Sequence, residues 1–360
     1  MLTFTPSPER FFVEEIPAYQ PAGEGGHTFL FIEKRALTTF DAIARIARAF
    51  GVAARDVGYA GMKDKQATTR QWLSVPGLDP AKALSLAEPD LKVLSAVGHP
   101  HKLRLGHLRG NRFEVVLTGA ATDEELADLR ARFSGISADG VPNRYGEQRF
   151  GADMANAVRG LGLLRGERNE RDKRKRKLML SALQSAVFNR ALELRATSGG
   201  LKQVRLGDVL KKTDTGGLFV STEVEVDQQR VDAGELIPTA PLPGGREVEP
   251  PPGTPARALE DEAIAAVGAT RDDFARAGRD LPGARRPVLL KLTDCAFSEE
   301  SAQDPVQSEP SQGSEPPTMG SGGQSPPSPT RRMRAVRLKF TLPAGGYATV
   351  VVASVTSPTA

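Results

Sequence analysis

The sequence is poor in the residues that build disulfides, metal sites and membrane helices. Its 360 residues include a single cysteine, Cys295, which excludes an intrachain disulfide and is typical of a reducing compartment. No apolar stretch approaches the roughly 20 residues that a membrane helix needs, and no apolar signal-peptide segment follows Met1. We therefore expect a cytoplasmic protein that has no membrane partner.

Motifs for metals and nucleotides are also missing. The four histidines are His27, His99, His101 and His107, and neither C-x-x-C nor H-x-x-x-H spacing accompanies them. The phosphate-binding pattern G-x-x-x-x-G-K-[ST] does not occur. Cys295 has no histidine near it in the sequence, which favours a small apolar residue over a nucleophile. The sequence thus predicts no metal site.

Charge is informative where it is clustered. Lys and Arg exceed Asp and Glu by only 48 − 44 = 4, and the sequence pI is about 9.2. The segment 165–177, however, holds eight basic residues and three acidic ones. Such a run is either a solvated helix face or a surface for phosphates. It favours a nucleic-acid partner if other segments point the same way.

One carboxylate stands out in the segment 58–72, GYAGMKDKQATTRQW. Asp64 lies between Lys63 and Lys65, and nearby positive charge favours the ionised form of a carboxyl group. An ionised carboxylate can act as a nucleophile or a base. Two glycines in the segment allow the backbone to approach a ligand closely. A solvated, charged turn is the alternative interpretation.

The segment 141–151, VPNRYGEQRFG, combines groups that recognise an unpaired base. An amide can read a base edge, guanidinium groups can contact phosphate, and aromatic rings can stack on an unstacked base. We expect substrate contacts from Asn143, Tyr145, Arg149 and Phe150.

A third segment, 102–113, alternates basic and apolar residues, which suits a strand or turn that follows a sugar-phosphate backbone. Together the three segments indicate a site for single-stranded RNA or a flipped base, with a carboxylate in it. We expect contacts to the RNA backbone from Lys63, Lys65, Lys102, Arg104 and Arg109.

These segments resemble the signatures of a known family, the tRNA pseudouridine-13 synthases of the TruD type. The matching strings are G-x-K-D-x-x-A-x-T-x-Q-W at 61–72, K-L-R-x-G-x-L-x-G-N-x-F at 102–113 and V-P-N-x-[FY]-G-x-Q-R-F-G at 141–151. Weaker matches lie at 11–27 and at 342–349. The resemblance implies that Asp64 is the catalytic aspartate. It also implies that Asn143 and Tyr145 contact the target uridine, and it adds His27 to the substrate-binding residues.

Two positions depart from the family pattern. Gly26 replaces an acid that commonly precedes the histidine, and Thr5 stands where the family usually has a lysine. The cationic partner of the aspartate is therefore open between four candidates: Lys63, Lys65, Arg10 and Arg149.

The function implied by the resemblance is the isomerisation of one uridine to pseudouridine in tRNA, at uridine 13 of the D-arm. The reaction breaks N1–C1′ and forms C5–C1′ with no redox change and no net water, so no cofactor is required. We expect a monomer. The alternative is a catalytically inert RNA-binding or RNA-chaperone protein on the same scaffold. Retention of Asp64 argues against it, because a binding module has no need of a carboxylate that faces polyanionic RNA.

The order of strand-like and helix-like segments predicts an α+β protein with a largely antiparallel sheet. The resemblance adds a pseudouridine-synthase-like catalytic domain at 1–155 and 284–360, with a smaller α/β insertion (TRUD) domain at 156–283. The segment 299–330 is rich in Pro, Ser, Gly, Gln and Glu, and cannot bury enough apolar surface to offset its ordering entropy. It is predicted to be a disordered loop. The apolar run at 350–352 predicts a buried strand.

Overall fold

The chain forms two compact units in the computed structural model, which describes residues 2–278, 281–300 and 331–357. Unit 1 comprises Met1–Asp139 and Lys291–Ala360, and unit 2 comprises Gly140–Leu290. The expected domain boundaries at 155/156 and 283/284 thus differ from these by 16 and 7 residues (155 − 139 and 290 − 283). The physical reason is a pair of short strands, Val141–Pro142 and Leu289–Leu290, which hydrogen-bond to each other and place both segments in unit 2.

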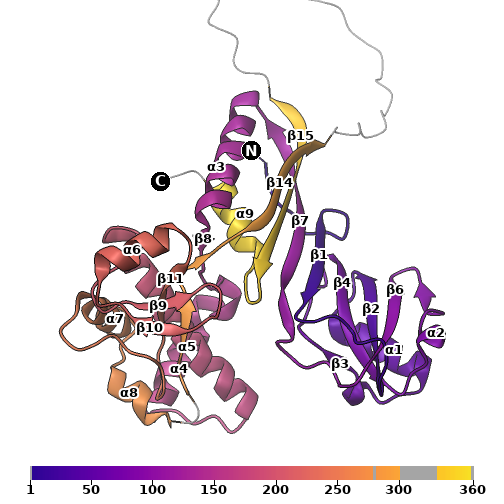
Figure 1. Ribbon diagram of the computed structural model, residues 1–360, viewed down its shortest axis with the longest axis horizontal. Helices are drawn as coiled ribbons and strands as arrows, with labels where there is room; N and C mark the ends of the chain where they lie inside the picture. Colours follow the sequence, from indigo (N-terminus) through magenta and orange to yellow (C-terminus); the bar gives the residue numbers. More distant parts are fainter. Residues whose placement is uncertain (1, 279–280, 301–330, 358–360) are drawn as a thin grey trace, which may run out of the picture. The chain divides into compact units, whose positions relative to one another are not determined.

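Unit 1 contains most of the strands (Figure 1). Its elements are β1 (Phe11–Pro17), β2 (His27–Arg35), α1 (Thr39–Phe50), a 3-10 helix (Ala54–Asp56), β3 (Gly58–Tyr59), β4 (Thr68–Pro76), α2 (Pro80–Ala83), β5 (Ala87–Glu88), β6 (Leu91–His99), β7 (Leu108–Ala121), α3 (Asp123–Asp139), β14 (Thr293–Glu300), β15 (Arg332–Pro343) and α9 (Ala348–Thr356).

These strands form one nine-stranded sheet in the order β14-β15-β7-β1-β4-β2-β6-β5, with β3 beside β4. Among the described pairings of this sheet, β1 with β4 is parallel and the others are antiparallel. The predicted α+β class with a largely antiparallel sheet is therefore confirmed. The parallel pair matters for the site, because it brings the start of the chain beside the strand that follows Asp64.

Helix α1 packs on one face of this sheet and closes its core. Thr38 and Asp41 form a capping box at its start, and Gly51 ends it in the left-handed region at φ 69°. Its apolar stripe, which includes Ile43 and Ile46, packs on buried side chains of β2, β4 and β6. Successive strand residues face opposite sides, so β2 points every second residue at α1.

At the other end of unit 1, α3 lies over β14 and β15, with α9 next to it (Figure 1). The ring of Phe133 on α3 lies 6.2 Å from Phe297 and 6.5 Å from Phe340, measured between centroids. The predicted strand at 350–352 is wrong, because these residues belong to the helix α9. A short apolar run fits a buried helix turn as well as a strand. Of the loop predicted at 299–330, residues 299 and 300 end β14, and 301–330 lie outside the described residues.

Unit 2 combines helices with a four-stranded sheet of order β10-β9-β11-β12. Its elements are β8 (Val141–Pro142), 3-10 helices at Glu147–Arg149 and Ala152–Met154, α4 (Ala155–Leu164), α5 (Lys173–Thr197), β9 (Val209–Lys212), β10 (Leu218–Val220), α6 (Val224–Asp232), β11 (Leu236–Leu242), α7 (Pro255–Ala266), α8 (Arg271–Arg276), β12 (Ala284–Pro287) and β13 (Leu289–Leu290). The core gathers around α5, whose Leu183, Val187 and Phe188 are buried. No described helix has the length and apolarity that crossing a bilayer requires.

Candidate active site

Asp64 lies in the loop between β3 and β4 and is exposed. Its Oδ1 accepts a hydrogen bond of 2.8 Å from the backbone N–H of Gln66. This local bond between an aspartate side chain and the backbone two residues on is an Asx turn, which restricts the rotation of the carboxylate. The carboxylate is thus presented to solvent in a restricted local conformation.

Hydrogen bonds from buried polar side chains hold this loop in place. Thr39 at the start of α1 accepts the backbone N–H of Lys63 at 2.9 Å and donates to Gln71 Oε1 at 3.0 Å. Gln71 on β4 in turn donates to the carbonyl oxygen of Gly61 at 3.3 Å. Since Thr39 and Gln71 are each at most 1% exposed, these bonds form in a medium of low dielectric, where they are stronger than in water.

Lys63 enters the same buried layer through its side chain. Its Nζ lies 2.5 Å from Glu15 Oε2, and both side chains are at most 4% exposed. Glu15 Oε1 also accepts the backbone N–H of Trp72 at 3.2 Å. Burial raises the pKa of Glu15, and the charge and hydrogen bond of Lys63 oppose that rise. Lys63 was expected to contact the RNA backbone, yet here it anchors the loop to β1.

Lys34 also donates a hydrogen bond to the loop. It lies on the α1-facing side of β2 and is 0% exposed. Its Nζ donates to the carbonyl oxygen of Leu37 at 2.5 Å and to the carbonyl oxygen of Asp64 at 3.1 Å. Sequence analysis missed this residue, because a lysine near the end of a strand is usually solvated. A signal existed: Lys34 continues the alternating row that starts at Leu30 and Ile32.

The segment 102–113 packs directly against the loop of Asp64. Gly106 N–H donates to the carbonyl oxygen of Ala60 at 2.8 Å, and Leu103 N–H donates to Ser74 Oγ at 2.9 Å. A side chain at Gly58 would lie 2.4 Å from the carbonyl oxygen of Leu103, so this close approach requires glycine. The two segments are therefore brought together within unit 1, as the sequence suggested.

The basic residues of the segment 102–113 differ in how far their side chains are exposed to solvent. Arg104 and Arg109 are exposed, and Lys65 beside Asp64 is exposed as well. Lys102 is half-buried and donates through Nζ to the carbonyl oxygen of Arg55 at 2.8 Å. Five side chains were expected to contact the RNA backbone. Three of them are in solvent, and those of Lys63 and Lys102 are bonded to other groups of the protein.

His27 starts β2 and is half-buried. Its Nδ1 is buried and has no hydrogen-bond partner among the described residues. Burial lowers the pKa of His27, and the positive charges of Lys102 and His101 lower it further. The imidazole is therefore neutral at pH 7, a state in which one ring nitrogen can accept a hydrogen bond.

Asn143 lies in unit 2 and is 3% exposed. Its Nδ2 donates to the carbonyl oxygen of Pro287 at 2.9 Å, and its Oδ1 accepts from the guanidinium of Arg286. Its backbone N–H donates to the carbonyl oxygen of Val288 at 2.9 Å. The amide that was expected to read a base is thus engaged with β12 and the residue that follows it.

The ring of Tyr145 is half-buried beside two arginines. The guanidinium carbon of Arg286 lies 4.2 Å from the ring centroid and that of Arg149 lies 5.6 Å away. Asn189 on α5 fixes the backbone of Tyr145 by two hydrogen bonds of 2.9 and 3.0 Å. Cationic planes on an aromatic ring form a surface on which a base can stack.

Phe150 has a different environment from the other residues of its segment. It is 5% exposed and packs with Ala157, Ala182 and Ala186 between α4 and α5. A ring in such a position supports the fold and offers no face to a base. The residue whose plane lies next to Tyr145 is Arg286, which sequence analysis missed because it is distant in sequence from segment 141–151.

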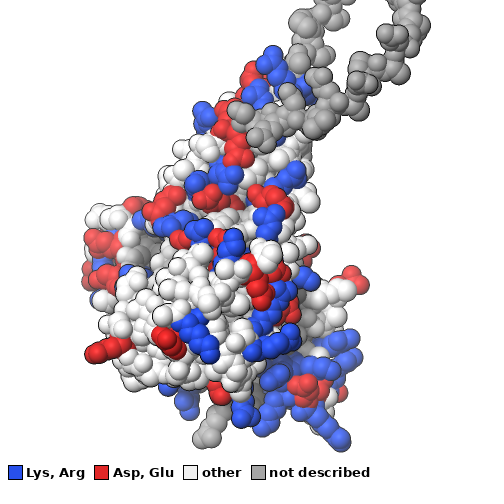
Figure 2. Space-filling view, turned by 90° about the vertical axis from the view of Figure 1, so that its right-hand side faces the viewer, with Lys and Arg blue, Asp and Glu red and all other residues white. Residues whose placement is uncertain are grey.

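The basic run 165–177 forms the start of α5 together with the turn before it. Asp172 caps the helix by accepting from Arg174 and Lys175 backbone N–H groups at 2.8 and 3.2 Å. Lys173, Lys175 and Lys177 are exposed. Cations are unfavourable at the positive end of a helix dipole, so this arrangement costs the isolated helix some stability. Figure 2 shows one face of the molecule, on which basic and acidic side chains alternate above and basic ones gather at the lower right.

No group of three or more His, Cys, Asp or Glu side chains in the described part of the chain is arranged to hold a metal ion. The polar groups around Asp64 are carbonyl, hydroxyl, amide and ammonium groups in the buried layer, with Glu15 already paired to Lys63. These groups are bonded to the loop of Asp64 and hold it in place.

The sequence matches the family described as tRNA pseudouridine synthase D (TruD) over residues 3–174 and 169–355. This chain belongs to the TruD family. A relative named tRNA pseudouridine synthase D from Anaeromyxobacter sp. (strain Fw109-5) is 43% identical over 292 residues, which are 79% of this chain and 82% of the relative. A second, from Anaeromyxobacter dehalogenans (strain 2CP-C), is 38% identical over 356 residues, 97% of this chain and 91% of the relative.

Among solved structures, a putative tRNA pseudouridine synthase D from Methanosarcina mazei has the same fold. Its TM-score is 0.72 at 20% identity, with 98% of this chain and 94% of that chain covered. The predicted TruD family and its pseudouridine-synthase-like fold are thereby confirmed.

Proposed function

We propose that the protein converts uridine 13 in the D-arm of tRNA to pseudouridine, with Asp64 as the catalytic carboxylate. As a member of the TruD family, the chain is a tRNA pseudouridine synthase, an isomerase that acts on tRNA. The choice of uridine 13 and the role of Asp64 are the parts that need an experiment.

The observation that carries the proposal is the support of the Asp64 loop. An exposed carboxylate stands on a loop that makes four hydrogen bonds with buried side chains, at the carbonyl oxygen of Gly61, at the backbone and the side chain of Lys63, and at the carbonyl oxygen of Asp64. Rigid support of this kind keeps a reactive group within the narrow geometry that catalysis requires. A merely solvated turn would not need it.

The isomerisation requires that the uracil base leave the base stack of the RNA. Extrusion costs a few kcal/mol, and stacking on an aromatic ring returns roughly 1–3 kcal/mol. We propose that Tyr145, with Arg286 next to its ring, is the platform for the uracil. The guanidinium group of Arg149 then offers a positive charge to a phosphate of the RNA. Asn143 acts by fixing Arg286 through its Oδ1, and Phe150 acts by packing α4 on α5.

During the reaction N1–C1′ breaks, the base turns, C5–C1′ forms and the proton of C5 is released while N1 gains one. Atoms and charge balance without a redox partner, in accordance with the expectation that no cofactor takes part. An ionised Asp64 can serve as the nucleophile or the base in this sequence.

The test is to incubate unmodified tRNA transcript with the wild-type protein and with Asp64→Asn, and to map pseudouridine along the RNA. We expect product at uridine 13 with the wild type, and a rate lower by at least about a thousandfold with Asp64→Asn. RNA affinity stays similar or rises slightly, since a carboxylate that repels phosphate is neutralised. Asp56→Asn, in the exposed 3-10 helix of the same unit, is the matched control and keeps full activity.

Each outcome has a distinct meaning. Pseudouridine at other positions, in tRNA or other RNA, contradicts the assignment to uridine 13 and leaves the reaction class standing. A folded wild-type protein that binds RNA and forms no pseudouridine in any RNA supports the inert RNA-binding alternative. Full activity of Asp64→Asn contradicts the role of the aspartate.

A further inference from the structure

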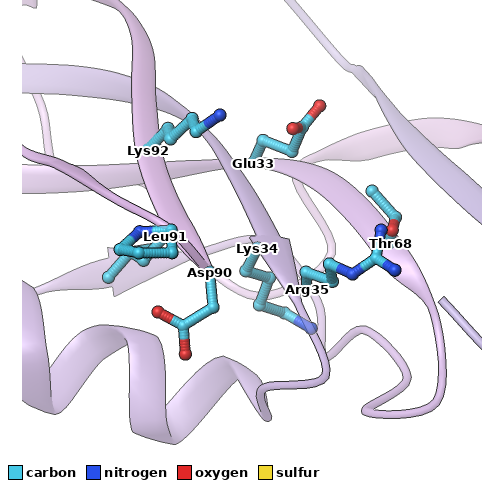
Figure 3. Close-up of a pocket in the computed structure, with 8 residues that line it drawn as sticks. Glu33, Lys34, Arg35, Thr68, Asp90, Leu91 and Lys92 are labelled. Atoms are coloured by element: carbon cyan, nitrogen blue, oxygen red, sulfur yellow. The ribbon is translucent and has the colours of Figure 1, made fainter.

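A buried lysine donates a hydrogen bond to the Asp64 loop and forms no ion pair with the described residues. Lys34 is 0% exposed, and its acceptors among the described residues are two backbone carbonyl oxygens, those of Leu37 and Asp64. Burying an ammonium group without a partner carboxylate costs free energy. Figure 3 shows its side chain directed away from Glu33 and Lys92, which project from the other side of the sheet.

The charges that shift the pKa of this ammonium belong to the loop of Asp64 and to α1. Burial lowers the pKa of Lys34 to about 8, the charges of Asp64 and Asp41 raise it, and that of Lys63 lowers it. Lys34 also borders a pocket between β2 and β6. The charged side chains that line this pocket with it are Glu33, Arg35, Asp90 and Lys92. Asp64 is thus the leading acidic neighbour of Lys34.

The remaining cations close to Asp64 in sequence are less suited to this task. The charge of Lys63 is matched by Glu15 at 2.5 Å. Lys65 is exposed, where water and salt screen its charge. Lys34 alone of the three combines complete burial with a direct hydrogen bond to the aspartate's own backbone, and attraction between charges is strongest where the dielectric is low.

We propose that Lys34 is a positioning residue for the isomerisation, which holds the Asp64 backbone and stabilises the negative charge of its carboxylate. This inference rests on the proposed function, since it assigns the cationic partner of the proposed catalytic group. It also explains why Thr5 can stand at the position where a lysine was expected: the required charge comes from β2.

The direction of the pKa shift gives the sign of the contribution of Lys34 to stability. The folded protein binds the proton of Lys34 less tightly than the unfolded chain, whose lysine pKa is 10.5. Its stabilising contribution is therefore present above pH 10.5 and is lost as the pH falls through about 8. At neutral pH the shift of this pKa is therefore an unfavourable contribution to stability.

The experiment compares wild type with Lys34→Met and the matched control Lys92→Met, an exposed lysine on the neighbouring strand β6. The readouts are kcat and KM on tRNA transcript between pH 6 and 9.5, RNA affinity and thermal unfolding. In the wild type we expect kcat to fall as the pH rises through about 8. Lys34→Met lowers kcat roughly ten- to a hundredfold, with KM and RNA affinity within about twofold, and abolishes this alkaline fall.

Two further measurements keep the inference testable if Lys34→Met folds poorly. Lys34→Arg retains a charge that does not titrate, so its residual kcat should stay level up to pH 9.5. Amide hydrogen exchange of Gln66, whose N–H is bonded to Asp64, should be faster in Lys34→Met than in wild type because the loop has lost its tether. That second readout does not depend on pseudouridine formation.

The inference is overturned if Lys34→Met forms pseudouridine with the kcat and pH profile of the wild type. It is also overturned if activity and RNA affinity fall together with the melting temperature, which would indicate a structural role. Absence of pseudouridine from wild type and variants alike contradicts the proposed function instead, and the exchange rate of Gln66 then still reports whether Lys34 holds the loop.

Discussion

Buried ionisable residues in this protein differ in how well their charges are compensated. In unit 1, Glu15 and Lys63 form a compact ion pair, so each charge is compensated. In unit 2, Glu247 is the poorly compensated member of a buried cluster. Its side chain is 1% exposed, Oε1 lies 3.8 Å from Arg271 and Oε2 has no hydrogen-bond partner among the described residues. Burial raises the pKa of Glu247 to about 8, Arg285 and Arg271 oppose the rise, and Glu260 and Glu249 add to it.

This shift predicts how stability depends on pH. The folded-state pKa of Glu247 lies above the ordinary value of 4.5, so its contribution is complete below pH 4.5 and is lost as the pH rises through about 8. The slope is at most about 1.4 kcal/mol per pH unit. We expect the wild type to unfold at lower urea concentration at pH 9 than at pH 6, and Glu247→Gln to show a smaller difference. Equal pH dependence in both proteins would show that the carboxyl group is ionised in the fold.

At the scale of elements, β14 and β15 are neighbours in the sheet, and residues 301–330, which come between them in the sequence, lie outside the described part of the chain. The two strands pair antiparallel, with Glu300 opposite Ala335 and Phe297 opposite Leu338. β15 also pairs along its whole length with β7, from Arg332 to Pro343. The pairing partners of β15 are therefore fixed on both sides.

Replacing residues 301–330 by a short Gly/Ser turn should leave folding and turnover nearly unchanged. Closing a shorter loop costs slightly less entropy, about 0.6 kcal/mol for each halving of its length. We expect the melting temperature to stay level or rise by a few degrees, measured beside a protein in which the same residues are scrambled. A large loss of stability on deletion, but not on scrambling, would mean that the length of the segment is needed.

For the whole molecule, RNA affinity is expected to fall steeply with salt. Exposed cations are available at Lys65, Arg104 and Arg109 in unit 1 and along 165–177 in unit 2. Each phosphate that they neutralise adds about −0.7 to the slope of log affinity against log salt for single-stranded RNA.

A triple variant, Lys173→Ala with Lys175→Ala and Lys177→Ala, should reduce that slope by about two. Its melting temperature should be level or higher, because these lysines oppose the dipole of α5. The double variant Lys82→Ala with Lys92→Ala removes exposed lysines outside the proposed surface and should leave the slope unchanged. An unchanged slope in the triple variant would place the RNA elsewhere.

The sequence by itself determined the features that depend on neighbours along the chain. The capping box at Thr122 and Glu125, the glycine end of α1 and the alternation within β15 each form among residues that are close together in the sequence. They follow from backbone hydrogen bonds and side-chain periods that act over a few residues. The reactive role of Asp64, which the residue types around it indicate, stays a prediction.

Only the tertiary structure decided which groups support that carboxylate. The buried cation is Lys34, 30 residues earlier in the chain, and the flanking Lys63 pairs with Glu15. Tertiary packing likewise turned Phe150 into a core residue and made 350–352 helical. Burial and electrostatic pairing depend on which segments meet in space, and the pairing of β1 with β4 that brings Glu15 beside this loop joins residues about 56 positions apart.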